Sequence, residues 1–504
     1  MSDKDMIKEE EIIRTAVFSN EYKSNGNYEI YEVTTKKALD AEKTLRIAEV
    51  SPFEYPDPIG EIPHVGPIVK PVLTWYPDTF LADLCNKGLL NGMTSENDTI
   101  PGLLETLCEQ GLNKRYSRIL PLHSERLASE MKIINQKEYA GGFLIIHDFI
   151  KFARSKNLLI SPGCGALPGS LVAYCLGITG VDPLKEDLIF ERYLNLEKET
   201  HSYGIRIDIE KGAKDLIFEY LSKKYGKGMP KLLEMADIHI RERVELSIIK
   251  ETIENISKNK RINVDLSAID KKDPEVYKYL CSGATEGVYF FDKDDPHTYT
   301  TGGWQDDEMK WHKYHPPIVM EDEDLFRAIM PKTMNELMAY LCLDRRLPDE
   351  HVEMYVHNKN NPDCITYECP DLEPILDYTY GCLVYQEQVM WILQVLGGLS
   401  PEQSDFCRRA LSKKQSSVTD EMRKRFVEGA MSTVPGYFTN RIDEDIADAI
   451  YDKLCYGAPY CFNKAHAVTE ALMIYDMVWL KYHYSLEFQE AAEKYKGIKS
   501  DVLP

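Results

Sequence analysis

Residues 204–210 carry the feature that most restricts the fold, a short segment in which isoleucine alternates with glycine or a charged residue. Alternation with a period of two is the pattern of a β-strand with one apolar and one polar face. Helical patterns flank this strand at residues 126–157 and 213–226. Short strands between helices are typical of α/β domains, so we predict an α/β domain over residues 101–250.

The chain is longer than one hydrophobic core usually allows, and its 504 residues divide into three parts. Residues 1–100 combine a predicted helix at residues 34–50 with a proline-rich run at residues 51–71, and we interpret them as an N-terminal arm. Helical patterns dominate residues 251–504. The sequence therefore predicts a multidomain chain in which a mostly α-helical domain follows the α/β domain.

Composition limits where the chain works and what it contacts. Hydrophobic residues make up 43% of the sequence, yet no run reaches the roughly 18 apolar residues of a membrane span, so we expect a folded protein without a membrane partner. The N-terminus lacks the apolar segment of a signal peptide. The 12 cysteines include no C-x-x-C pair, which favours reduced thiols. We therefore expect a cytoplasmic protein.

A basic segment contrasts with the net charge of −22, which by itself argues against a nucleic-acid partner. Residues 408–425 contain seven Arg and Lys against two acidic residues. A helix is predicted to lead into this segment, because Ser400 suits an N-cap and Gln403 completes a capping box. Arg409 and Lys413 then share a helix face, where they would meet phosphate groups or complement the helix dipole.

A glycine-rich turn, SPGCGALPGS, lies between an apolar strand and a predicted helix at residues 161–170. Free backbone N–H groups at such a turn are able to hold a phosphate, which makes Gly163, Gly165, Gly169 and Ser170 candidate binding residues. Tight packing also explains the same glycines, and we favour this interpretation.

Three segments bring a family resemblance. They are GSLVAYCLGITGVDPLKEDLIFERYLN at residues 169–195, LEPILDYTYGCLVYQEQVMWILQVLGGLSPEQSDFCRRALSKK at 372–414, and CFNKAHAVTEALMIYDMVWLKYHYSLEF at 461–488. In this order they resemble the α subunit of bacterial DNA polymerase III, the C-family replicase. The resemblance implies a palm of the nucleotidyltransferase (polymerase β-like) type at residues 101–250 and a fingers-like helical domain at residues 251–504. Residues 1–100 would be a remnant of the family's upstream region.

The resemblance also locates the catalytic positions. The family holds metal with the first two aspartates of a P-D-x-D-x-D-F strand, and these positions fall on Gly204 and Arg206 here, leaving only the third as Asp208. Ungapped counting places the family's remaining catalytic aspartate on His239, although Asp237 lies two residues earlier on the same alternation. Between residues 226 and 236 there is also no room for the family's thumb. We therefore expect no catalytic residues, no metal and no cofactor.

Two hypotheses follow from these replacements. In the first, Arg206 takes the place of the metal's charge by pairing with Asp208, Glu210 or Asp237, and the chain is an inactive polymerase III α-like protein. In the alternative, those three acids form a shifted Mg²⁺ site of an active DNA-directed DNA polymerase, with a thumb supplied by another chain. A purely structural subunit of a larger assembly is a third, lesser hypothesis.

The fingers-like domain supplies the predicted binding residues. By the resemblance, the nucleotide- or DNA-binding residues there are Arg408, Arg409, Lys413, Lys414, Asn463, Lys464 and His466. We accordingly expect a binding module for DNA, dNTP, a replication protein or another polymerase chain.

Overall fold

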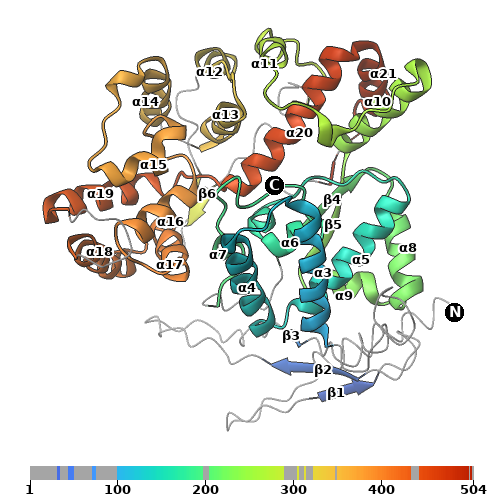
Figure 1. Ribbon diagram of the computed structural model, residues 1–504, viewed down its shortest axis with the longest axis horizontal. Coiled ribbons are helices and arrows are strands. Elements are labelled where there is room, and N and C mark those ends of the chain that lie inside the picture. The colour runs from blue at the N-terminus through green and yellow to red at the C-terminus, as the bar shows by residue number, and fades with distance from the viewer. Residues whose placement is uncertain are drawn as a thin grey trace.

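The computed structural model describes residues 31–34, 44–49, 71–74, 99–196, 204–288, 303–305, 311–313, 322–346, 349–432, 442–498 and 500–501 (Figure 1). Among these residues, no helix combines the length and the apolar character that crossing a membrane requires. No disulfide joins two of the described cysteines.

The N-terminal part contains a three-stranded antiparallel sheet. Its strands β1 (Tyr31–Thr34), β2 (Thr44–Glu49) and β3 (Pro71–Thr74) are ordered β1-β2-β3. The predicted helix at residues 34–50 is therefore wrong over β2, and residues 35–43 lie outside the described residues. The segment TLRIAE alternates polar and apolar residues, and that period of two suits a strand hydrogen-bonded on both edges.

A parallel strand pair lies at the centre of the second part, and one of its strands is the strand that the alternating segment predicts. Strands β4 (Ile205–Glu210) and β5 (Ile238–Arg243) run parallel, and residue 160 adds an antiparallel bridge to β4 at Ile209. The strand isoleucines are buried in one core with the surrounding helices. These helices are α3 (Ile100–Arg115), α4 (Pro121–Gln136), α5 (Ala140–Ser155), α6 (Leu171–Cys175), α7 (Phe190–Tyr193), α8 (Lys214–Tyr225) and α9 (Met229–Met235).

The link from α8 to β5 is short. It contains one seven-residue helix, α9, and continues directly into the strand. After β5 the chain enters α10 (Val244–Lys260), whose apolar side chains share a core with the C-terminal helices rather than with β4 and β5. The first core thus ends near Ile240, and the α/β character predicted for this region is confirmed. Its assignment to the nucleotidyltransferase type stays a prediction.

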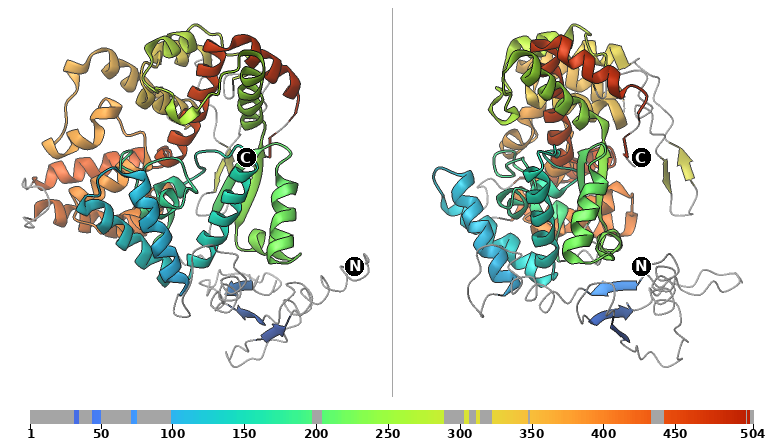
Figure 2. Two further views of the ribbon diagram at one scale, coloured as in Figure 1. Left: turned by 45° about the vertical axis from the view of Figure 1, so that its right-hand side comes forward. Right: turned by 90° about the vertical axis from the view of Figure 1, so that its right-hand side faces the viewer.

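The remaining part is helical, as predicted, apart from a hairpin of β6 (Gly303–Gln305) and β7 (Trp311–Lys313). Its helices are α11 (Pro274–Cys281), α12 (Asp322–Ile329), α13 (Met334–Arg346), α14 (Asp349–Asn360), α15 (Glu373–Leu376), α16 (Gln386–Val395), α17 (Pro401–Ser412), α18 (Ser416–Met431), α19 (Glu444–Gly457), α20 (Lys464–His483) and α21 (Ser485–Tyr495). Helix α20 starts beside the glycine-rich turn and ends beside α21, which packs along α10 (Figure 2). Helix α20 therefore joins the α/β part to the helical part.

Candidate functional site

The strand pair brings together the three positions that the resemblance assigns to catalytic aspartates. In the parallel register, Arg206 lies opposite His239, and the amide of Ile205 donates to the carbonyl of Asp237. A side chain at Gly204 would begin 3.8 Å from Asp237 Oδ2. Gly204 and Arg206 are exposed at this end of the pair. The fold therefore brings the three positions close together. None of the three carries a carboxylate.

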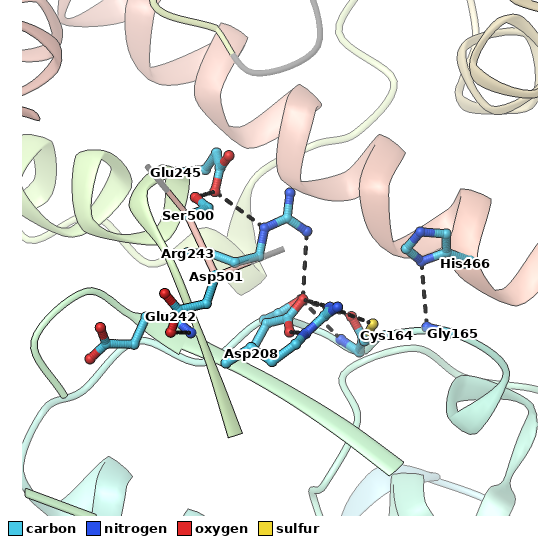
Figure 3. Close-up of polar contacts among 12 residues, drawn as sticks. Cys164, Gly165, Asp208, Glu242, Arg243, Glu245, His466, Ser500 and Asp501 are labelled. Atoms are coloured by element: carbon cyan, nitrogen blue, oxygen red, sulfur yellow. Dashed lines mark hydrogen bonds and ion pairs between the residues drawn. The ribbon is translucent and has the colours of Figure 1, made fainter. Parts of the chain in front are cut away.

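Asp208 lies deeper on the same face and is neutralised by two arginines of β5. Arg241 donates to both oxygens of its carboxylate, with Nε 2.8 Å from Oδ1 and Nη2 2.9 Å from Oδ2. Arg243 Nη1 lies 3.6 Å from Oδ2 (Figure 3). Asp208 is almost fully buried. A bidentate guanidinium is the geometry that compensates best for removing a carboxylate from water.

Arg243 extends this charge network to two further helices. Its Nη1 donates to Glu470 Oε1 of α20 at 2.7 Å, and its Nε donates to Glu245 Oε2 of α10 at 3.2 Å. The guanidinium is itself buried, so three carboxylates from three elements converge on one cation. The ion pair of Arg243 with Glu470 also fastens the strand pair to the helix that continues into the C-terminal helices.

The predicted pairing of Arg206 is corrected by this geometry. Arg206 points outward, whereas the guanidinium that meets Asp208 belongs to Arg241 on the neighbouring strand. Position 206 lies at the exposed end of the face, and the covered part of that face begins at Asp208. The cation that pairs with Asp208 is therefore supplied by β5 and not by Arg206.

The other two carboxylates of the alternative metal site also have cationic or donor partners. Glu210 accepts from Lys250 Nζ at 2.5 Å and from the amide of Leu159 at 2.8 Å. Asp237 Oδ1 lies 2.9 Å from His239 Nε2. Mg²⁺ prefers several free oxygen ligands around one point. Within the described part of the chain, no group of three or more His, Cys, Asp or Glu side chains is arranged to hold a metal ion, so these residues do not fit Mg²⁺.

Both edges of the strand pair are occupied by other backbone segments. The bridge at residue 160 lies beside β4, and residues 500–501 lie beside β5. There the amide of Asp501 donates to the carbonyl of Glu242 at 2.7 Å, and the amide of Val244 donates to Ser500 Oγ at 2.8 Å (Figure 3). The strand pair is therefore held from several directions.

The glycine-rich turn faces the protein with its amides. The four predicted residues all donate internally: Gly163 to Ser161 Oγ (3.3 Å), Gly165 to His466 Nδ1 (3.4 Å), Gly169 to Ala166 O and Ser170 to Leu167 O (both 3.0 Å). A β-carbon at Gly169 would approach the carbonyl oxygen of Ile189 to 2.9 Å, so this glycine is needed for packing. These contacts favour the packing interpretation over the phosphate-binding one.

A buried carboxylate completes this arrangement at the start of α6. Glu130 of α4 accepts from the amide of Leu171 at 2.9 Å, the amide of Val172 at 3.0 Å and the hydroxyl of Ser170 at 2.9 Å. The unpaired amides of a helix start attract an anion, and here the protein supplies its own. This internal anion adds to the support for the packing interpretation of the turn.

Cys164 of the same turn lies against the charge network. Its Sγ accepts from Arg241 Nη2 at 3.0 Å. Burial, with a further contribution from the nearby Asp208 carboxylate, raises the pKa of this thiol to about 12. The thiol is therefore neutral at physiological pH and serves as a packing group beside the guanidinium.

Helix α17 begins as predicted. Ser400 is the N-cap, its Oγ accepts from the amide of Gln403 at 3.2 Å, and Gln403 Oε1 accepts from the amide of Ser400 at 3.0 Å. One turn later, the buried Asp405 holds both arginines: Arg408 Nη2 donates to its Oδ1 at 2.7 Å and Arg409 Nε lies 3.1 Å from its Oδ2. The two arginine side chains differ in exposure, 6% for Arg408 and 32% for Arg409.

The other predicted binding residues of the helical part fall into two groups. Lys413 and Lys414 are exposed after the end of α17. Lys464 is buried, with Nζ 4.5 Å from the centre of the Tyr378 ring, and desolvation lowers the pKa of its ammonium. His466 accepts from Gly165, as described above. The remaining predicted residue, Asn463, is the N-cap residue of α20.

Sequence reasoning missed the residues that close the site. They are Glu130, Arg241, Arg243, Glu245 and Glu470. A signal for two of them was present, because β5 reads IHIRER and its arginines alternate with isoleucines as the acids of β4 do. Pairing the two strands would have placed Arg241 opposite Asp208, as the register does. The contributions of Glu130 and Glu470 arise from tertiary packing, for which the sequence offered no local pattern.

Comparison with protein families agrees with this architecture. Residues 102–277 match the bacterial DNA polymerase III alpha NTPase domain, and residues 321–433 match the bacterial DNA polymerase III alpha subunit finger domain. Together the two matches cover more than half of the chain, in the order expected from the sequence. Both parts of the chain are therefore similar to one class of protein, the α subunit of a bacterial DNA polymerase.

Curated relatives carry the same description. The DNA polymerase III subunit alpha of Halalkalibacterium halodurans is 29% identical over 82% of this chain and 46% of its own length. That of Staphylococcus epidermidis (strain RP62A) is 27% identical over 82% of this chain and 45% of its own, and that of Staphylococcus aureus (strain COL) 26% over 76% and 43%. The chain spans less than half the length of these relatives. It belongs, as a divergent member, to the bacterial DNA polymerase III α family.

Proposed function

We propose that this chain is a polymerase III α-like protein of DNA replication that does not catalyse nucleotidyl transfer and acts as a binding module for nucleic acid, nucleotide or a replication protein. The observation that carries the proposal is the bidentate pairing of Asp208 with Arg241, reinforced by Arg243. The proposed place of action is the cytoplasm.

Electrostatics explains why this pairing opposes catalysis. Two-metal polymerisation needs carboxylates that hold cations next to the primer hydroxyl and the departing pyrophosphate. A guanidinium already neutralises Asp208, and a second one is buried behind it, so a divalent cation would meet two positive charges within the same site. Removing either arginine would weaken the compensation of a buried carboxylate, at a cost of up to several kcal/mol.

The substituted positions support the same conclusion. Gly204 carries no ligand atom, Arg206 adds a positive charge, and His239 is engaged with Asp237. The short link through α9 also leaves no separate domain between α8 and β5 to grip a primer-template duplex. A chain with these features retains the scaffold of the α/β and helical parts and lacks the groups that would move a nucleotidyl group.

One observation favours the alternative, an active DNA-directed DNA polymerase. Asp237 is half-exposed, with 37% of its side chain accessible, and it lies at the same end of the strand pair as positions 204 and 206. An active site rebuilt around Asp237 would need ligands or a thumb from another chain. The two proposals differ in a single measurable activity.

Primer extension with the full chain tests the proposal. We expect no extension of a labelled primer-template with all four dNTPs in either Mg²⁺ or Mn²⁺, while the same DNA is bound in a parallel binding assay. Extension that disappears in Asp237→Ala would overturn the proposal in favour of the alternative. Asp208→Ala is the second variant, and its folding must be checked because the aspartate is buried. Extension that persists in both variants would point to a contaminating polymerase, so both are needed.

A further inference from the structure

Helix α17 presents an exposed aromatic ring in line with two basic side chains. Phe406 and Arg409 are three residues apart on one face of α17, and Lys413, the C-cap residue, follows Arg409 by four residues. Phe406 is 42% exposed, so much of its ring is accessible to solvent. The opposite face, which includes Asp405 and Arg408, is buried.

The charges on this face are held in place. Asp405 fixes Arg409 through an ion pair, and Asp405 is itself anchored by Arg408 and by Asn195 Nδ2, which donates to its Oδ2 at 3.0 Å. A guanidinium anchored through one nitrogen keeps donors for a phosphate or a base while losing little conformational entropy on binding. Lys413 is exposed at the end of the helix and adds a mobile positive charge.

Helix α17 is joined to the α/β part at Asp405, which accepts from Asn195. Leu196 directly follows Asn195 in the sequence and is 43% exposed, and Phe406 directly follows Asp405. Glu402 lies one turn before Phe406 and is the acidic residue in the first turn of α17.

An exposed ring beside fixed and mobile cations suits one class of ligand. Bases stack on aromatic rings when they are not paired in a duplex, and backbone phosphates meet Arg and Lys nearby. We propose that the face formed by Phe406, Arg409 and Lys413 binds single-stranded nucleic acid by stacking a base on Phe406. This inference rests on the proposed binding function and names its partner. A duplex is a poorer fit because its base faces are covered.

Fluorescence anisotropy with the full chain tests this surface. The probes are a fluorescein-labelled oligothymidylate and the same strand annealed to its complement. The wild-type chain should prefer the single strand. Phe406→Ala should weaken single-strand binding roughly tenfold, as expected for one stacked base, and leave duplex binding unchanged. Lys413→Gln should lower the magnitude of the salt slope of single-strand binding by about 0.7, the value of one phosphate contact.

Matched controls are available elsewhere on the surface. Leu486→Ala removes another exposed apolar side chain, on α21, and Lys223→Gln removes an exposed lysine, on α8. Both should leave binding unchanged. The proposal is overturned if Phe406→Ala binds the single strand as tightly as Leu486→Ala, a result that leaves the general binding function in place. Absence of single-strand binding at low salt also overturns it and leaves this face to a protein partner, whereas catalytic inactivity is judged independently by primer extension.

Discussion

The strand pair β4–β5 and helix α17 both carry arginines beside an aspartate, yet they use them differently. On the strand pair, Arg241 and Arg243 are buried. Arg241 pairs with Asp208, and Arg243 pairs with Glu470. On α17, Asp405 pairs with the buried Arg408 and with Arg409, whose side chain is 32% exposed. The same residue types therefore stabilise the fold in one region and remain available to a ligand in the other. Burial, which a charge count does not reveal, separates the two roles.

The largest expected effect is on the strand pair. Arg243→Met should lower the free energy of unfolding by about 3–5 kcal/mol, because it leaves the buried Glu470 and Glu245 without their cation. Urea denaturation measures this loss. Arg206→Met, on the exposed end of the neighbouring strand, is the matched control and should change stability by no more than about 0.5 kcal/mol. Equal losses of stability in both variants would mean that buried and exposed arginines of the strand pair do not differ in their contribution to the fold.

Glu130 should show the next largest effect. Its carboxylate is buried and accepts from the amides of Leu171 and Val172, the Ser170 hydroxyl and Arg126 Nε. Glu130→Gln keeps the shape but removes the charge that these donors share, so we expect a loss of roughly 1.5–3 kcal/mol in urea denaturation. The matched control is Glu125→Gln, an exposed residue of the same helix. A neutral outcome at Glu130 would mean that the start of α6 does not need an internal anion.

A pair of variants within α17 sharpens the comparison further. Arg408→Met should destabilise the chain by about 1–3 kcal/mol, since it weakens the compensation of the buried Asp405. Arg409→Met should cost less than about 1 kcal/mol, because its ion pair is partly exposed. Binding of single-stranded DNA should respond in the opposite order, with Arg409→Met the weaker binder. Thermal unfolding and anisotropy on the same preparations would show whether the two roles are divided in this way.

The sequence predicted the parts of this architecture that have local patterns. The period of two at residues 205–210, the capping box at Ser400 and the helical character after residue 251 all depend on neighbouring residues, and each agrees with the structure. The helix expected at residues 34–50 was wrong over β2, where partner strands rather than local propensity decide the conformation.

The candidate site was harder to predict because its contacts join distant segments. The contact between Arg243 and Glu470 joins positions 227 residues apart, and that between Asn195 and Asp405 joins positions 210 residues apart. The resemblance assigned the family's catalytic positions to Gly204, Arg206 and His239, and that assignment stays a prediction. Which cation meets Asp208, and whether the amides of the glycine-rich turn are free, depends on packing that a single sequence does not contain.

The smallest expected effect separates the stability of α17 from the chemistry of its exposed face. Ser400→Ala removes the hydroxyl that caps the helix and should cost about 1 kcal/mol, whereas Ser400→Gly should cost only a few tenths. The cap lies at the opposite end of the helix from Lys413, so neither variant should alter single-strand affinity in anisotropy. A parallel loss of stability and affinity in Ser400→Ala would mean that the face depends on the order of the whole helix. The strand pair and α17 would then differ only in how strongly their arginines stabilise the fold, because the arginines of α17 would affect binding through the stability of the helix.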